Sequence, residues 1–62
     1  MKKWIVNNNN NDYIMHRGND IINIHVNNYN YVWFGTIKGK EVNGVSKKTI
    51  GLDGLISLIN NE

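Results

Sequence analysis

Apolar and polar side chains alternate with a period of two through the middle of the chain, and this alternation restricts the fold more than any other sequence feature. Successive side chains of a β-strand point to opposite faces, so the alternation predicts strands rather than helices. It is clearest over 21–26, where one face takes Ile22, Ile24 and Val26 and the other takes Asn23 and His25. The segment 31–37 carries Tyr, Val, Trp and Phe in succession, residues that favour a pleated surface. We expect 31–37 to be the central strand.

Two further strands precede this pair. Residues 3–6 form the first, which we expect to end at the asparagine run 7–11 because Asn tolerates positive φ and favours turns. Residues 13–17 form the second, and the turn residues 18–20 separate it from the strand 21–26.

The pair Asn43-Gly44 predicts a hairpin turn, because it is flanked by valines and both central residues of a type I′ turn need positive φ. Residues 37–42 would then pair with 45–50. The facing pairs in that register are Val42 with Val45, Lys40 with Lys47, and Ile37 with Ile50. Gly39 leaves a second interpretation open, in which a turn or bulge lies there instead.

After Gly51 the period changes to that of a helix. Apolar residues recur at i, i+3, i+4 and i+7, and they are Leu52, Leu55, Ile56 and Ile59. Asp53 could cap a short helix, or Thr49 could cap a longer one that holds Asp53 in its first turn. The predicted Asn-Gly hairpin favours the shorter helix.

These elements predict a single α+β domain over 1–62 that is mostly β. It is a small antiparallel meander of four to five strands, an open sheet or an SH3-like barrel, with one short C-terminal helix. A chain of 62 residues has no room for a second core. The layout is similar to that of archaeal chromatin-protein barrels and chromodomain-like folds, and the resemblance is one of layout and not of motif residues.

The composition excludes several classes of chemistry. The chain has no cysteine, which removes disulfides, thiolate metal sites and cysteine nucleophiles. It has no apolar run of the ~18 residues that a membrane span needs, and Met1 to Val6 is too short for a signal peptide. We therefore expect no membrane association and a cytoplasmic location. Asn, Ile and Lys are abundant, while Ala and Pro are absent and Arg17 is the only arginine, a bias of A/T-rich genomes that fits a phage or mobile-element protein.

The two histidines and their nearby carboxylates do not form a recognisable catalytic or metal-binding motif. His16 and His25 fall on different predicted strands, with Asp12 and Asp20 as the available companions. A zinc site needs three or four converging ligands, and no nucleophile elbow or phosphate-binding loop is present. The sequence thus predicts no catalytic residues, no metal, no cofactor and no enzymatic activity.

The strand 31–37 has large apolar residues on both faces, which one short helix cannot cover. Tyr31 and Trp33 point one way while Val32 and Phe34 point the other. A barrel would hide one of these rows; otherwise the uncovered row binds a partner. We expect a protein partner or a second copy at Tyr31 and Trp33, with Asn28 and Asn30 at the rim. The predicted function is that of a small binding protein, an inhibitor that acts by steric occlusion.

Four lysines suggest an alternative function. These are Lys38, Lys40, Lys47 and Lys48, which lie around the predicted hairpin. Glu41 is the one acidic residue among them. Such a cluster beside sheet aromatics could bind single-stranded nucleic acid. Lysines on an edge strand also prevent sheets from pairing edge to edge, which is the structural interpretation of the same residues.

Overall fold

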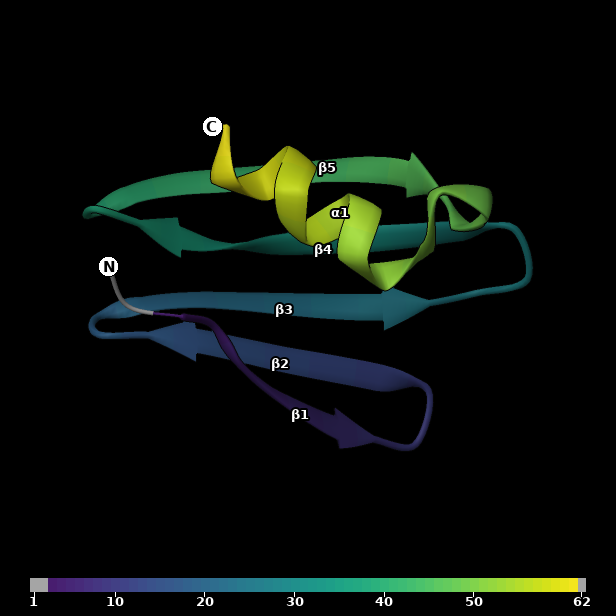
Figure 1. Ribbon diagram of the computed structural model, residues 1–62, viewed down its shortest axis with the longest axis horizontal. Coiled ribbons are helices and arrows are strands. Elements are labelled where there is room, and N and C mark those ends of the chain that lie inside the picture. The colour runs from purple at the N-terminus through teal and green to yellow at the C-terminus, as the bar shows by residue number, and fades with distance from the viewer. Residues whose placement is uncertain (1–2, 62) are drawn as a thin grey trace.

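The computed structural model describes residues 3–61 and shows an antiparallel sheet followed by a short 3₁₀ turn and an α-helix (Figure 1). The strands are β1 (Ile5–Asn9), β2 (Asp12–Arg17), β3 (Asp20–Val26), β4 (Asn30–Ile37) and β5 (Lys40–Lys47), and η1 (Lys48–Ile50) and α1 (Gly51–Asn60) follow. The strand order β1-β2-β3-β4-β5 makes an open meander whose edges are β1 and β5. The central strand is therefore β3, and the prediction that 31–37 is central is wrong, because β1 and β2 lie on one side of β3 while β4 and β5 lie on the other. The predicted fold class is confirmed, with an open sheet rather than a barrel. Of the predicted domain 1–62, the first two residues and the last lie outside the described part.

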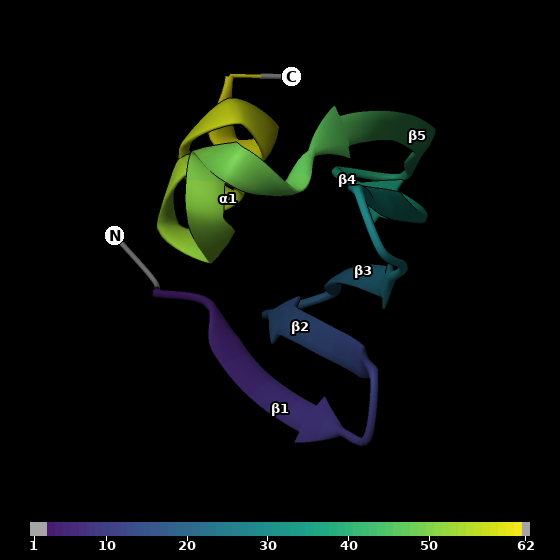
Figure 2. The same cartoon turned by 90° about the vertical axis from the view of Figure 1, so that its right-hand side faces the viewer.

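The core lies between one face of the sheet, called here the inner face, and α1, which Figure 2 shows on that side of the sheet. Its buried side chains are Met15, Ile22, Ile24, Tyr31, Trp33, Ile37, Leu55 and Ile59. The predicted faces of β3 and the predicted apolar stripe of the helix are thereby confirmed. Each fully buried side chain of this size contributes roughly 1.5–3 kcal/mol, so this single layer of contacts holds the helix to the sheet.

The turn between β4 and β5 lies at Lys38-Gly39, not at Asn43-Gly44. Both turn residues have positive φ, 52° for Lys38 and 79° for Gly39, as a two-residue hairpin turn requires. Asn43 and Gly44 lie inside β5, opposite the aromatic residues of β4. The second interpretation, a turn at Gly39, is therefore confirmed. The predicted facing pairs are wrong, because Val42 pairs with Gly35, Val45 with Val32, Lys40 with Ile37 and Lys47 with Asn30.

The glycine at position 44 is required by packing rather than by a turn. The indole ring of Trp33 lies against it, and a Cβ at this position would be 2.7 Å from Cε2 of that ring. The indole Nε1 of Trp33 also donates to the hydroxyl of Ser46 at 3.4 Å. Any larger residue at position 44 would displace the largest side chain of the core.

The ends of two elements differ from the prediction. β1 continues through Asn9, and the turn follows at 10–11, where Asn10 has a φ of 60°. α1 begins at Gly51 with Ile50 as N-cap and no side-chain cap, so neither Asp53 nor Thr49 caps it. Asp53 lies in the first turn, as the longer-helix alternative predicted. Neither helical segment described over 3–61 has the length and apolar character needed to cross a membrane.

Candidate protein-binding face

The predicted contact residues of β4 lie in the core. Tyr31 and Trp33 are 7% and 3% exposed because α1 covers their face of the sheet. The prediction that they form an accessible contact surface is therefore wrong. Of the predicted rim residues, Asn28 is exposed in the turn before β4 and Asn30 is half-buried at its start. Because Tyr31 and Trp33 are buried beneath α1, these two asparagines do not form the rim of an exposed aromatic surface.

The uncovered side of the sheet, called here the outer face, instead carries the large apolar residues that alternate with the core. Phe34 lies next to Trp33 and is 54% exposed, and Ile14 and Ile21 are 39% and 47% exposed. Together these residues form a band, the outer stripe, that consists of Ile5, Ile14, Ile21, Phe34, Val32 and Val45. This is the apolar surface that the single helix leaves uncovered, and it lies on the opposite face from the one predicted.

Strand register makes the outer stripe continuous. Three rows of paired residues cross the outer face, and the middle one, called here the central row, consists of Asn7, Ile14, Asn23, Phe34 and Asn43. One flanking row adds Ile5 and Ile21, and the other adds Val32 paired with Val45. Diagonal neighbours on adjacent strands are about 7–8 Å apart, which apolar and aromatic side chains can bridge. The stripe thus runs across the whole sheet from β1 to β5.

A shallow depression lies beside the stripe and has a polar edge. It encloses about 280 Å³ and is bounded by Ile14, Phe34, Asp12 and His25, among others. Nδ1 of His25 lies 2.7 Å from Oδ1 of Asp12, and both side chains are more than half exposed. A pair this exposed contributes about 0.2–1 kcal/mol, so it shapes the rim more than it stabilises the fold. The depression can receive an apolar group against Phe34.

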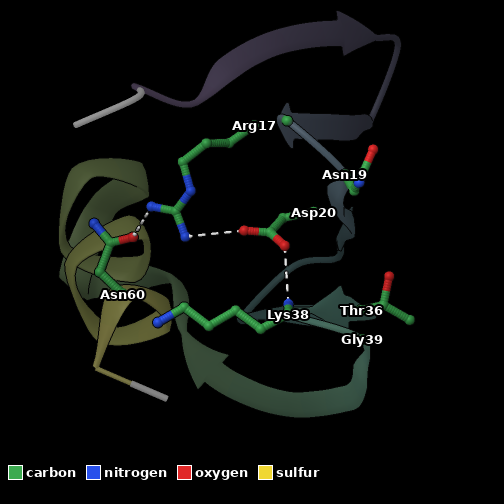
Figure 3. A pocket seen from close by; sticks show the side chains of 8 residues that line it. Arg17, Asn19, Asp20, Thr36, Lys38, Gly39 and Asn60 are labelled. Carbon is green, nitrogen blue, oxygen red and sulfur yellow. Dashed lines mark hydrogen bonds and ion pairs between the residues drawn. The ribbon is translucent and has the colours of Figure 1, made fainter.

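A larger concavity of about 1050 Å³ lies at the end of the sheet next to the C-terminus of α1 (Figure 3). Arg17 donates to Oδ1 of Asn60 at 3.0 Å and lies 3.4 Å from Oδ2 of Asp20, and its guanidinium stacks on Trp4. Trp4 donates to the same Asn60 oxygen at 2.8 Å. The Lys38 N–H, and then Arg17, lower the pKa of Asp20. Because these groups satisfy one another, the network ties the residue before β1, the end of β2, the start of β3 and the β4–β5 turn to the helix.

The predicted basic cluster does not form. The turn at Lys38-Gly39 places Lys38 and Lys40 at one end of β5, whereas Lys47 and Lys48 lie at the other end. Seven steps of ~3.3 Å separate Lys40 from Lys47, a distance of about 23 Å. Lysines at both ends of an edge strand match the structural interpretation, protection against edge-to-edge pairing.

The outer-face residues Ile14, Ile21 and Val45 were missed by sequence reasoning. The alternation of the strands could have identified them, because each of these three residues is adjacent in sequence to an inner-face residue and therefore points to the outer face. Among residues 3–61, no three histidine or carboxylate side chains gather closely enough to hold a metal ion. Comparison with known proteins finds no matching family model, no matching curated protein and no matching solved structure.

Proposed function

We propose that the protein is a small non-enzymatic binding protein that acts through protein–protein contact at its outer face. The observation that supports this most is the outer stripe, an exposed apolar band that crosses all five strands. Monomeric proteins rarely expose contiguous apolar patches larger than ~300–600 Å², and patches of that size are often functional. A partner that covers the stripe would remove this surface from water.

The size of the stripe indicates how strongly it can bind. Burying about 400 Å² of apolar surface at ~25 cal/mol per Å² yields roughly 10 kcal/mol before losses. Association itself costs an estimated 4–15 kcal/mol in lost freedom. The stripe alone therefore supports modest affinity, and the polar groups around it must add contacts. Phe34 is the central anchor we expect, because interface cores are enriched in aromatic side chains.

The shape of the face favours occlusion of another surface. The outer face of an open sheet is broad and has no wall opposite it, so it covers a partner's surface rather than enclosing a small molecule. We infer that the partner is an enzyme inhibited by steric blockage, and that the protein is encoded by a phage or mobile element and acts in the cytoplasm of the host cell. The composition bias toward Asn, Ile and Lys supports that origin.

Affinity capture with matched variants tests the proposal. Immobilised wild-type protein is exposed to nuclease-treated lysate of a low-GC bacterium, in parallel with Phe34→Lys and Leu58→Ser. Leu58 is 41% exposed on α1, away from the outer face, so it controls for the loss of one exposed apolar side chain. We expect one protein to be retained by wild type and L58S but not by F34K. Recovery of nucleic acid alone from a parallel lysate without nuclease, or equal retention by F34K, would refute the proposal.

A further inference from the structure

We propose that in the free protein the outer face is covered by a second copy of the chain, packed face to face about a twofold axis that passes between the Asn23 side chains of the two copies. This inference rests on the proposed function, because it names an occupant of the same face. The target would then exchange with the second copy. Three observations support this inference. They are the polarity pattern of the central row, the hydrogen-bonding capacity of the amides in that row, and the area of the outer face.

The central row reads the same from either edge of the sheet. Asparagine occupies it on β1, β3 and β5, and Ile14 and Phe34 occupy it on β2 and β4. An axis along the strands would place β1 over β5 and β2 over β4 of the other copy. An axis across the strands would place each strand over its own equivalent. Within the central row, either axis, drawn between the Asn23 side chains of the two copies, sets amide against amide and apolar against apolar.

The amide groups of this row favour a copy over a plain apolar surface. An asparagine side chain is both a donor and an acceptor, so two of them related by a twofold axis can bond reciprocally. Covering the same amide without a partner costs about 1–3 kcal/mol. Three such amides lie in the row, on Asn7, Asn23 and Asn43. A uniformly apolar partner would leave all three unsatisfied, whereas a second copy pairs them.

The charges on the outer face permit this contact. Asp12 and Glu41 contribute acidic groups, and Lys47 contributes a basic one from the far end of β5. With either axis, neither carboxylate faces another carboxylate: Asp12 faces Val32 or His16 of the other copy, and Glu41 faces Ile5 or Val45. Like charges opposed across an interface would disfavour association, and this distribution avoids a general repulsion.

The area of the outer face matches the lower limit of a specific dimer. β3 and β4 have seven and eight residues. At ~3.3 Å per residue and ~4.8 Å between strands, the five-stranded face measures about 25 by 20 Å. Burying about 500 Å² on each copy gives about 1,000 Å² in total, where specific contacts begin and most crystal contacts end. An interface at this lower limit is typical of weak, reversible contacts, and we expect a dissociation constant on the order of micromolar.

Sedimentation over the micromolar range tests the self-association. We expect the wild-type mass to rise from monomer to dimer with concentration, L58S to behave likewise, and F34K to stay monomeric at every concentration. A wild-type protein that stays monomeric at high micromolar concentration would overturn the inference. The proposed function would survive that result if F34K still abolished capture of a target, so the two failures are distinguishable.

A thiol placed on the proposed axis provides a second test that does not depend on weakening the fold. The chain has no cysteine, so Asn23→Cys introduces a single thiol. A short bifunctional thiol reagent should join two N23C chains because their thiols face each other across the axis. Ser57→Cys, exposed on α1, is the matched control and should stay uncoupled. Coupling of S57C but not of N23C would contradict the arrangement.

Discussion

Replacing Gly44 by alanine tests the register of the sheet and the packing of its largest side chain together. The added Cβ would lie 2.7 Å from Cε2 and 3.1 Å from Nε1 of Trp33. Trp33 is 3% exposed and lies beneath α1, so the ring cannot move outward without disturbing the helix. We therefore expect Gly44→Ala to destabilise the fold through steric overlap.

The expected loss is about 1–2 kcal/mol of unfolding free energy. Overpacking a core costs typically about 1–3 kcal/mol, and alanine recovers about 0.4–1 kcal/mol by restricting the unfolded chain. In a domain of this length, ~1 kcal/mol lowers Tm by about 4–8 °C. The melting temperature of G44A should therefore fall by roughly 5–15 °C.

Thermal and urea unfolding, followed by tryptophan fluorescence and circular dichroism, measures the change. The matched control is Asn43→Ala, which alters an exposed outer-face residue and should stay within about 0.5 kcal/mol of wild type. If Asn43-Gly44 were the hairpin turn, N43A would also be costly, because Asn43 would need positive φ. An unchanged G44A, or an N43A as damaging as G44A, would refute the register.

Three other outcomes follow from the structure. Gly39→Val should lower the urea midpoint by more than the equivalent of ~1 kcal/mol, because position 39 has a φ of 79°, which a β-branched residue adopts only under strain; an unchanged midpoint would contradict the turn at 38–39. Ile59→Ala should unfold much of the population at room temperature, because truncating a fully buried isoleucine costs about 2–5 kcal/mol and the unfolding free energy of a chain this small is of similar size. The control Ser57→Ala should leave the circular dichroism spectrum unchanged. Asp20→Asn should destabilise the fold at pH 7 and progressively less in acid below pH 3.8. The Lys38 N–H and Arg17 lower the pKa of Asp20 from its ordinary 3.8, so its contribution is fully present above that value and is lost as pH falls through the lower folded pKa. Equal destabilisation at pH 7 and in acid would contradict that assignment.

The strands and the helix followed from the sequence because their patterns are local. The alternation through 21–26 separates core from surface within one strand, and the i, i+3, i+4 spacing of 52–59 does the same for the helix. Neither pattern depends on which distant segment lies opposite. These segments are therefore confirmed in type, with boundaries that differ by a few residues.

The hairpin prediction failed where two local signals competed. Lys38-Gly39 and Asn43-Gly44 both suit a two-residue turn, and local preference favours the Asn-Gly pair. A turn at 38–39 lets eight residues of β4 pair with eight of β5 and places Gly44 under the ring of Trp33. Cross-strand packing outweighs the preference of one dipeptide, which is worth about 1 kcal/mol or less.

The sequence predicted an exposed apolar row on β4, but the exposed row lies on the opposite face of the sheet from the predicted one. The sequence by itself determined that β4 is apolar on both sides and that one helix covers a single side. An apolar row stays exposed because the sheet is open, and the structure decided that. Which row is exposed depends on register: Trp33 pairs with Ile24 and Phe34 pairs with Asn23. Apolar neighbours on adjacent strands let α1 bury Trp33, whereas asparagines surround Phe34. Only the tertiary structure decided this, because burial depends on neighbours brought together from separate strands.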